Sequence, residues 1–273
     1  MGTPNTTTLD VALVQYDIAW EKKPANHARI EAELLAAKVS SGALVLIPEL
    51  GDTGFSFDLD AICNDGGQTL SWARRMAETH GWTLQIGHAE QAPDGRGRNC
   101  ATVVCPDGRM GTYQKMHLIS LLGEDRSYDP GHHILLADLQ NGITLSPCIC
   151  YDLRFPELFR ISEHQGANLF GVIACWPIER IDAWRQLLIS RAIENQSWVL
   201  GCNRVGNDPN LSYGGTSIII SPEGNVLAEA DQTEEVVLKA TLKIDSGTRF
   251  RDRFPFTSEK RLDLLGSADV IRI

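Results

Sequence analysis

Pro147-Cys-Ile-Cys150-Tyr-Asp-Leu-Arg-Phe-Pro156-Glu157 joins an apolar strand to a helix, and this junction indicates the class of fold. The run Ile143–Cys150 is apolar and strand-sized, whereas Pro156 suits the first turn of a helix that extends to His164. A further apolar run, Ala167–Ala174, follows the helix. Strand, helix and strand in succession are typical of α/β proteins, which usually place their sites at strand ends. Cys150, at the end of its strand, is therefore a candidate site residue.

Strand-like and helix-like segments alternate along the rest of the chain, with hairpin signals among them. Pro106-Asp-Gly108 and Asn141-Gly142 are tight-turn sequences, and each lies between two strand-like runs. Hairpins among helices predict an α/β domain with mixed strand directions rather than an all-parallel, doubly wound sheet. No linker, repeat or low-complexity segment interrupts the pattern, so residues 1–273 are predicted to form a single domain. Strands are predicted at 9–16, 43–48, 82–89, 100–105, 110–113, 134–139, 143–150, 167–174, 198–202, 217–221, 226–230 and 236–244, and helices at 24–39, 68–80, 156–164 and 180–195.

The composition is that of a globular protein with an acidic surface. Hydrophobic residues make up 43% of the 273 residues and charged residues 22%, which disfavours disordered, collagen-like and coiled-coil architectures. The net charge of −10 disfavours nucleic acid as a partner, because an acidic surface repels phosphate backbones. No apolar run approaches the roughly 18 residues of a membrane span, so no membrane association is predicted.

The cysteines predict a reducing compartment. The chain has seven of them, an odd number, without the dense paired spacing of a disulfide framework and without a Cys-x-x-Cys motif. Several lie in apolar runs, as buried free thiols do. The N-terminus also lacks the apolar core of a signal peptide, and a cytoplasmic location is expected. Cys148 and Cys150 point to the same strand face, but four tetrahedral ligands are not evident and no metal is predicted.

Two further strand ends carry side chains that could act in catalysis. Glu49 follows an apolar strand and Pro48, where partial desolvation would raise the pKa of its carboxyl group toward that of a useful general base. Alternatively, Glu49 only caps a loop. Lys115 follows a hairpin strand, and taken alone it is predicted to be a solvated lysine at a strand edge. The neighbouring His117 reads more readily as a hydrogen-bonded structural histidine than as a base.

Cys150 needs a partner to act as a nucleophile. A free thiol has a pKa of about 8.5, so only a small fraction is thiolate at neutral pH. A neighbouring cation or base must therefore activate it.

Together the three strand ends resemble the nitrilase (carbon–nitrogen hydrolase) superfamily, with Glu49, Lys115 and Cys150 in that order. The local sequences Pro48-Glu49, Lys115-Met-His-Leu118 and Cys150-Tyr-Asp-Leu-Arg-Phe-Pro-Glu157 match as well, and the resemblance covers about residues 9–255. It implies an α-β-β-α sandwich of two mixed sheets with outer helices, a homodimer and no cofactor. It also implies a second glutamate ahead of a Pro-Gly pair, which Glu124 satisfies.

Within the superfamily the chain is most similar to bacterial omega-amidases, through sequences such as Trp176-Pro177 and Gly201-Cys-Asn-Arg-Val-Gly206. The resemblance implies hydrolysis of the primary amide of a short 2-oxo dicarboxylic acid monoamide, similar to 2-oxoglutaramate, through a cysteine thioester. Deaminated-glutathione amidase and N-carbamoyl amidohydrolase are the alternative activities, and a non-catalytic scaffold is the alternative class. Gly51-Asp52 departs from the pattern, where a bulkier residue than glycine is expected.

The resemblance assigns roles to the candidate residues. Glu49 would be the base, Cys150 the nucleophile, and Lys115 with the backbone N–H of Tyr151 would face the oxyanion. Glu124 would position Lys115 or the incoming water. The candidates for binding the substrate are Tyr151, Trp176 and three arginines, whose guanidinium groups suit a carboxylate: Arg180, Arg204 and Arg185. Alternatively, each arginine is a surface or structural residue and Trp176 packs in the core. Arg154 and Glu157 are expected to form an ion pair that supports the nucleophile.

Overall fold

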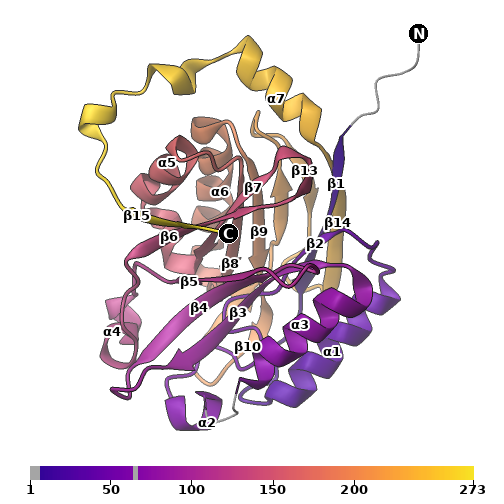
Figure 1. Ribbon diagram of the computed structural model, residues 1–273. Helices are drawn as coiled ribbons and strands as arrows, with labels where there is room; N and C mark the ends of the chain where they lie inside the picture. Colours follow the sequence, from indigo (N-terminus) through magenta and orange to yellow (C-terminus); the bar gives the residue numbers. More distant parts are fainter. Residues whose placement is uncertain (1–6, 64–66) are drawn as a thin grey trace.

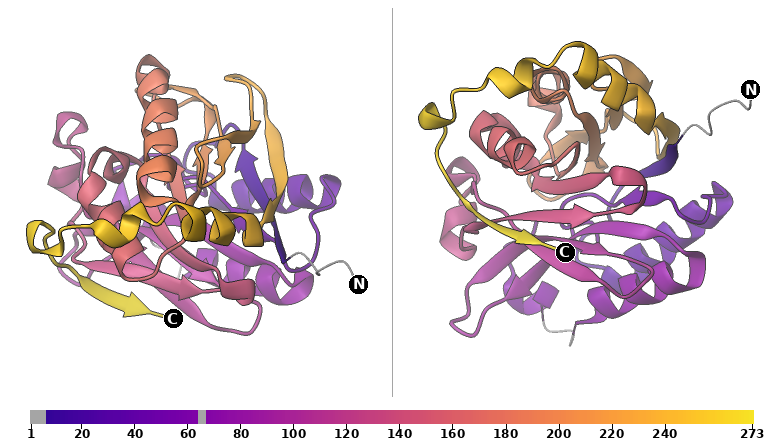
Figure 2. Two further views of the ribbon diagram at one scale, coloured as in Figure 1. Left: turned by 90° about the horizontal axis from the view of Figure 1, so that it is seen from above. Right: turned by 45° about the horizontal axis from the view of Figure 1, so that its top comes forward.

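The computed structural model describes residues 7–63 and 67–273 and has four layers, helices–sheet–sheet–helices (Figures 1 and 2). Within the described residues, the first sheet has the strand order β14-β1-β2-β3-β4-β5 and the second β13-β12-β9-β8-β7-β6-β15. Both are mixed: β1, β2 and β3 run parallel while β4 and β5 are antiparallel, and β7, β8 and β9 run parallel between antiparallel neighbours. The α-β-β-α sandwich and the mixed sheets are therefore confirmed. Whether the whole chain is a single domain stays a prediction.

The strands of the first sheet are β1 (Thr8–Gln15), β2 (Leu44–Leu46), β3 (Thr83–Gln91), β4 (Gly97–Val104), β5 (Met110–Gln114) and β14 (Val236–Lys243). Those of the second are β6 (His133–Asp138), β7 (Thr144–Ile149), β8 (Leu169–Ala174), β9 (Trp198–Asn203), β12 (Ile218–Ile220), β13 (Val226–Glu229) and β15 (Asp269–Arg272), and a separate ribbon pairs β10 (Val205–Asn207) with β11 (Ser212–Gly214). The α-helices are α1 (Lys23–Ala36), α2 (Leu59–Cys63), α3 (Gln68–His80), α4 (Glu124–Ser127), α5 (Pro156–His164), α6 (Ile181–Asn195) and α7 (Ile244–Arg253).

The helices cover the outer faces of the sheets because each presents one apolar side. α1 and α3 lie on the first sheet, and α5 and α6 lie on the second (Figure 2). In α6, Trp184, Leu188 and Ala192 are fully buried and belong to the core that the second sheet shares with the inner face of the first. The helix predicted at 180–195 is therefore confirmed, with its apolar side toward the core.

Both hairpin predictions are confirmed. β4 and β5 are antiparallel around the turn at Pro106–Gly108, and β6 and β7 are antiparallel around Asn141-Gly142. Asn141 has a φ of 66°, a left-handed conformation that asparagine tolerates better than most residues.

Among the described helices, none is long and apolar enough to cross a membrane.

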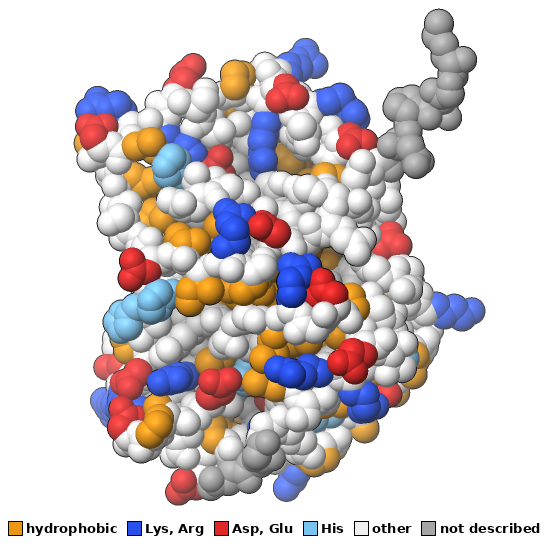
Figure 3. Space-filling view, viewed as in Figure 1, with side chains coloured by type: hydrophobic (Ala, Val, Ile, Leu, Met, Phe, Trp, Pro, Cys, Tyr) orange, Lys and Arg blue, Asp and Glu red, His pale blue; other side chains and the backbone are white. Residues whose placement is uncertain are grey.

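The C-terminal segment was not predicted from the sequence. After α7 the chain crosses over α5 and α6 and ends in β15, which pairs in parallel with β6 (Figure 1). Space-filling Figure 3 shows Lys and Arg side chains interspersed with Asp and Glu on this face.

The segment after β2 is held tightly, and this positions Glu49. A Cβ atom on Gly87 of β3 would lie 2.3 Å from the Pro48 carbonyl oxygen and 2.6 Å from Cα of Glu49, so only glycine fits there. A Cβ atom on Gly51 would lie 2.7 Å from the Ile47 side chain. The expectation of a bulkier residue at Gly51 is therefore wrong, because the turn leaves no room for one. The next residue, Asp52, is buried and forms an ion pair with Lys23 of α1 at 3.6 Å.

Candidate active site

Four of the predicted catalytic residues meet at one place. Glu49 follows β2, Lys115 follows β5, Cys150 follows β7, and Glu124 opens α4. Glu49, Lys115 and Glu124 are fully buried, whereas Cys150 is half-buried and lines a pocket of ≈ 300 Å³ together with Glu49. The proximity that the resemblance implied for these four residues is thus present in the fold.

Lys115 is the centre of this cluster. Its Nζ lies 2.8 Å from Glu49 Oε1 and 2.9 Å from both carboxylate oxygens of Glu124. Burial by itself would lower the pKa of Lys115, but the charges of Glu124 and Glu49 outweigh it and raise the pKa well above its ordinary value. Lys115 is therefore a permanent cation at neutral pH.

Glu124 binds its own loop as well as Lys115. Its Oε2 accepts a hydrogen bond from the backbone N–H of Ile119 at 2.8 Å. Burial raises the pKa of Glu124, Lys115 opposes this rise, and the neighbouring charge of Glu49 adds to it. Glu124 thus holds the lysine together with Glu49 and orders the loop at residues 119–124, part of which lines the pocket.

The thiol of Cys150 is protonated in the resting protein. Burial raises its pKa well above the ordinary value, the charge of Glu49 raises it further, and Lys115 opposes the rise. The cysteine also has a φ of 46°, in the left-handed region that non-glycine residues rarely adopt. This backbone conformation marks the point where the chain leaves β7 and turns into the 3₁₀ helix η3 (Cys150–Arg154). A base must therefore remove the proton before the sulfur can attack.

Glu49 is placed to be that base. Its Oε1 accepts hydrogen bonds from Lys115 and Asn99, and its Oε2 accepts one from the backbone N–H of Cys175 at 2.8 Å. These donors fix the orientation of the carboxylate, which lines the same pocket as Cys150 and whose charge raises the pKa of the thiol. Tyr151 is the second residue of η3, where backbone N–H groups have no intrahelical acceptor, so its N–H is available beside Cys150.

Asn99 and Asp152 are functional candidates that the sequence analysis missed. Asn99, on β4, donates from Nδ2 to Glu49 at 2.8 Å and to Glu124 at 2.9 Å, and so bridges the two carboxylates. Asp152 accepts hydrogen bonds from Ile149 N–H, from the Tyr113 hydroxyl and from His117 N–H. Asp152 therefore ties the Cys150 turn to the segment that carries Lys115. Asp152 could have been found from its place in the motif at residues 150–157. Nothing in the sequence around Asn99 indicates a role in the site.

His117 is a structural histidine, as the sequence analysis favoured. Its Nδ1 lies 2.8 Å from Asp152 Oδ1, and its ring stacks on Phe155 with centroids 3.8 Å apart. Cys148 is also structural, since it is fully buried in the core and does not line the pocket. In the described ranges, no group of three or more His, Cys, Asp and Glu residues could hold a metal ion.

The predicted substrate-binding residues separate into two groups. Tyr151, Trp176 and Arg180 line the pocket with Cys150. Arg204 does not: it is fully buried, pairs with Asp17 at 2.9 Å and lies over the ring of Tyr213. Arg185 pairs with Glu229 at the surface. Arg204 and Arg185 are thus held by structural partners away from the pocket.

The expected ion pair between Arg154 and Glu157 is not found in the described structure. The reason is that Arg154 ends η3, whereas Glu157 is the second residue of α5 and is exposed. The Arg154 guanidinium instead lies 4.9 Å from the centroid of the Trp176 ring and lines the pocket. Neither Arg154 nor Arg180 has an ion-pair partner among the described residues, and Nη2 of Arg180 is buried without a hydrogen bond.

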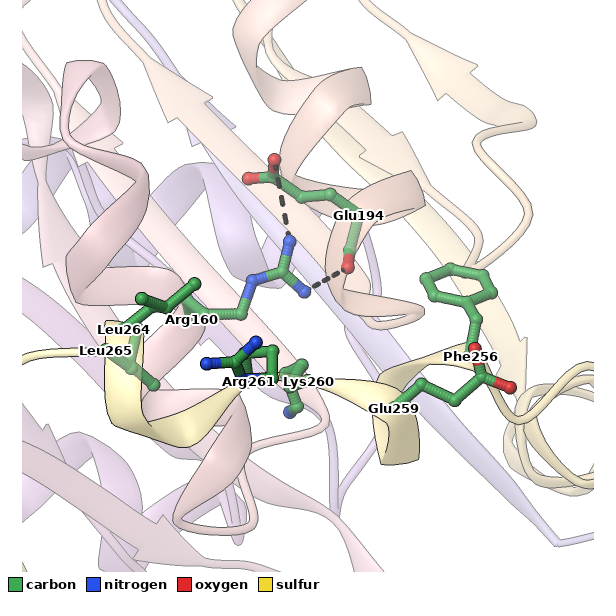
Figure 4. A pocket seen from close by; sticks show the side chains of 8 residues that line it. All are labelled: Arg160, Glu194, Phe256, Glu259, Lys260, Arg261, Leu264 and Leu265. Atoms are coloured by element: carbon green, nitrogen blue, oxygen red, sulfur yellow. Dashed lines mark hydrogen bonds and ion pairs between the residues drawn. The ribbon is translucent and has the colours of Figure 1, made fainter.

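A larger cavity of ≈ 430 Å³ lies elsewhere, between α5, α6 and the C-terminal segment (Figure 4). Its Arg160 is bound by Glu194, through both the carbonyl oxygen and the carboxylate. The described lining residues include no thiol or hydroxyl side chain. In the described chain, this cavity therefore lacks a thiol nucleophile such as that of Cys150 in the smaller pocket.

Comparisons with known proteins identify the family of the chain. The carbon-nitrogen hydrolase family model matches residues 10–252. The chain is 34% identical over 258 residues to a 2-oxoglutaramate amidase of Bacillus subtilis, covering 93% of this chain and 98% of that one. It is 31% identical to omega-amidase YafV of Escherichia coli K12, covering 90% and 94%. A solved carbon–nitrogen hydrolase superfamily protein of Xanthomonas campestris, which carries an arsenic adduct in its active site, is 31% identical with a TM-score of 0.86 and covers 93% and 97%.

The chain belongs to the carbon–nitrogen hydrolase family, as its sequence motifs predicted. It is accordingly a hydrolase of carbon–nitrogen bonds.

We expect Asn99→Ala to lower kcat by about 10- to 100-fold with little change in KM. The reason is that a hydrogen bond to a charged group contributes about 1.5–3 kcal/mol, and Asn99 donates to both carboxylates. Steady-state ammonia release measures the effect. Asn168→Ala is the matched control. The Asn168 side chain also makes two hydrogen bonds, with Thr144 and Gly142, but it lies before β8, whereas the pocket lies after β8. Equal losses of kcat in the two variants would contradict a specific role for Asn99.

Proposed function

We propose that the protein is an omega-amidase that hydrolyses the primary amide of a short 2-oxo dicarboxylic acid monoamide, similar to 2-oxoglutaramate, to the acid and ammonia. The observation that carries the proposal is a single pocket lined by Cys150, by Glu49 of the Glu49–Lys115–Glu124 cluster and by two arginines that have no carboxylate partner among the described residues. The relatives named 2-oxoglutaramate amidase and omega-amidase support it.

The first half of the reaction makes a thioester. Glu49 accepts the thiol proton of Cys150, and the sulfur attacks the amide carbon. Lys115 and the Tyr151 N–H face the developing oxyanion, where one such donor contributes about 3–4 kcal/mol to lowering the barrier. The C–N bond then breaks, and the protonated Glu49 gives its proton to the departing ammonia.

The second half regenerates the thiol. Glu49, ionised again, takes a proton from a water molecule as its oxygen attacks the thioester carbon. The C–S bond breaks, the acid leaves, and the proton held by Glu49 returns to the Cys150 sulfur. Glu124 keeps Lys115 in place throughout, because both oxygens of its carboxylate accept hydrogen bonds from the ammonium at 2.9 Å.

The two arginines suit the anionic end of such a substrate. Arg154 and Arg180 both line the pocket, and a guanidinium binds a carboxylate through two parallel hydrogen bonds. Trp176 holds both in place, since its ring supports Arg154 and its Nε1 donates to the Arg180 carbonyl oxygen at 2.8 Å. A pocket of ≈ 300 Å³ is at the small end of ligand sites, which favours a short substrate.

The proposal predicts ammonia release from 2-oxoglutaramate well above that from deaminated glutathione, glutamine or a simple nitrile. Cys150→Ala and Glu49→Gln are expected to abolish this turnover while circular dichroism shows a folded protein, because nucleophile and base act as a unit. Wild-type turnover by folded Cys150→Ala protein would refute the mechanism. Activity on another amide but none on 2-oxoglutaramate would refute only the substrate. Lys115→Ala is a poorer test, since it leaves two buried carboxylates without their cation.

We expect Arg154→Gln and Arg180→Gln each to reduce kcat/KM for 2-oxoglutaramate by about 10- to 100-fold, because each removes a charged hydrogen bond worth about 1.5–3 kcal/mol. Hydrolysis of an uncharged amide of similar length should fall much less. Arg185→Gln serves as the control, since Arg185 pairs with Glu229 away from the pocket. Equal losses of kcat/KM on charged and uncharged amides would show that these arginines do not bind the substrate carboxylate.

We also propose that the protein is a homodimer in the cytoplasm. The dimer is implied by the superfamily resemblance, and the seven cysteines, all without disulfides, support a reducing compartment. Native mass spectrometry of the purified protein is expected to give twice the mass of the 30.1 kDa chain. A monomer at micromolar concentration would contradict the dimer.

A further inference from the structure

A second thiol lies beside the nucleophile. Cys175 follows β8, lines the same pocket as Cys150 and is itself buried. The two sulfur-bearing residues are close, because Cys150 Sγ lies 3.9 Å from the carbonyl oxygen of Cys175. The amide reaction uses the backbone N–H of Cys175, which binds Glu49, but has no use for its thiol.

The strand register permits a bond between the two sulfurs. β7 and β8 are neighbouring parallel strands in which Ile149 pairs with Ile173, so Cys150 and Cys175 leave the ends of adjacent strands at nearly the same level. Adjacent strands lie about 4.8 Å apart, and disulfides join Cα atoms about 4.4–6.8 Å apart. Cys175 Sγ donates a hydrogen bond to the Glu49 carbonyl oxygen at 3.1 Å and packs in the hydrophobic core, so bonding to Cys150 requires its side chain to rotate out of these contacts.

The other cysteines are placed differently. Cys100, Cys105, Cys148 and Cys202 are buried, and neither they nor the half-buried Cys63 line this pocket. A small oxidant that enters the pocket therefore meets Cys150 first, with Cys175 next to it.

We propose that Cys150 and Cys175 form a peroxide-induced, reversible disulfide that protects the active-site thiol. The proposal rests on the roles proposed for Cys150 and Glu49 but not on the identity of the amide substrate. Glu49 takes the proton of Cys150, whose sulfur attacks hydrogen peroxide. The O–O bond breaks, the leaving hydroxide takes the proton from Glu49 to form water, and Cys150 becomes a sulfenic acid. The Cys175 sulfur then attacks the Cys150 sulfur, the S–O bond breaks, and the hydroxyl group leaves with the Cys175 proton as a second water.

The consequence is inactivation that a reductant reverses. Peroxide has then taken two electrons from the two thiols, and Cys150 is shielded from further oxidation to the sulfinic acid, which reductants do not restore. Without Cys175, the sulfenic acid in the pocket stays open to a second peroxide molecule.

The test is peptide mapping after graded hydrogen peroxide treatment of the reduced full chain. Trypsin separates the two cysteines, since Cys150 lies in the peptide 127–154 and Cys175 in the peptide 161–180. We expect a crosslink between these peptides that rises as activity falls, and both changes should reverse with dithiothreitol. Cys175→Ser should give no crosslink, accumulate Cys150 sulfinic acid and fail to regain its own starting activity.

Cys148→Ser is the matched control, because Cys148 shares the tryptic peptide of Cys150 but faces the core. The crosslink should persist in this variant, and its disappearance would overturn the assignment to Cys150. Sulfinic acid at Cys150 without any crosslink in the wild type would also overturn the proposal. Labelling of reduced protein with iodoacetamide separates the two ideas: an alkylated Cys150 without a crosslink refutes only the disulfide, whereas an inert Cys150 refutes the proposed nucleophile as well.

Discussion

The buried ammonium of Lys115 is the interaction on which the active site depends. Glu49 and Glu124 contact it from two sides, and all three side chains are removed from solvent. Burying an ion costs several kcal/mol of hydration, so each carboxylate is tolerable only because the lysine and the donors around it replace the lost water. Asn99 and the Cys175 N–H supply those donors. The charge of Glu49 raises the pKa of the Cys150 thiol and Lys115 opposes this rise, so the cluster also acts on the proposed nucleophile.

The fold brings these groups together by ending strands of both sheets at one place. Glu49 and Lys115 follow β2 and β5 of the first sheet, while Cys150 and Cys175 follow β7 and β8 of the second. The pocket therefore lies between the sheets, and its geometry depends on their relative position. Asp152 resists a displacement of one sheet against the other, because it bonds Ile149 at the end of β7 and Tyr113 of β5. Gln85 of β3 forms a second polar contact between the sheets, because its side chain donates a hydrogen bond to the carbonyl oxygen of Gly171 on β8 at 2.8 Å.

The sequence predicted most of the long elements and the residues of the catalytic cluster, for a physical reason. An apolar strand that ends in a charged or reactive side chain is visible locally, as at Glu49, Lys115 and Cys150, and α3 and α5 have the bounds that their patterns predicted. The short elements β10, β11 and α4 have too few residues for a periodic pattern and form through tertiary contacts. β15 depends on the distant β6, to which it adds as a parallel strand after the chain has crossed α5 and α6.

Within the site, the errors share one cause, which is that spacing along the chain does not fix the direction of a side chain. Asn99 looks like any polar residue of an antiparallel strand, and its two partners lie 50 and 25 positions away. Arg204 follows β9 at a strand end, as a site residue should, but its guanidinium turns toward Asp17. Arg154 and Glu157 are three positions apart, which suits a pair on one helix, but the chain changes from η3 to α5 between them.

The position of Arg154 and Arg180 matters more in an acidic chain than it would in a basic one. With 25 Lys and Arg against 35 Asp and Glu, a guanidinium at the surface readily finds a carboxylate, as Arg185 does with Glu229. Arg154 and Arg180 line one pocket, and neither guanidinium group has such a partner in the described chain. Both could therefore bind an anion, and Nη2 of Arg180 is a buried donor without a hydrogen bond. A substrate carboxylate would provide that anion, and the binding energy gained there can orient an amide at Cys150. In the proposed reaction an uncharged amide would leave both guanidinium groups without an anion, so the two residues that favour an anionic substrate would also select against its neutral analogue.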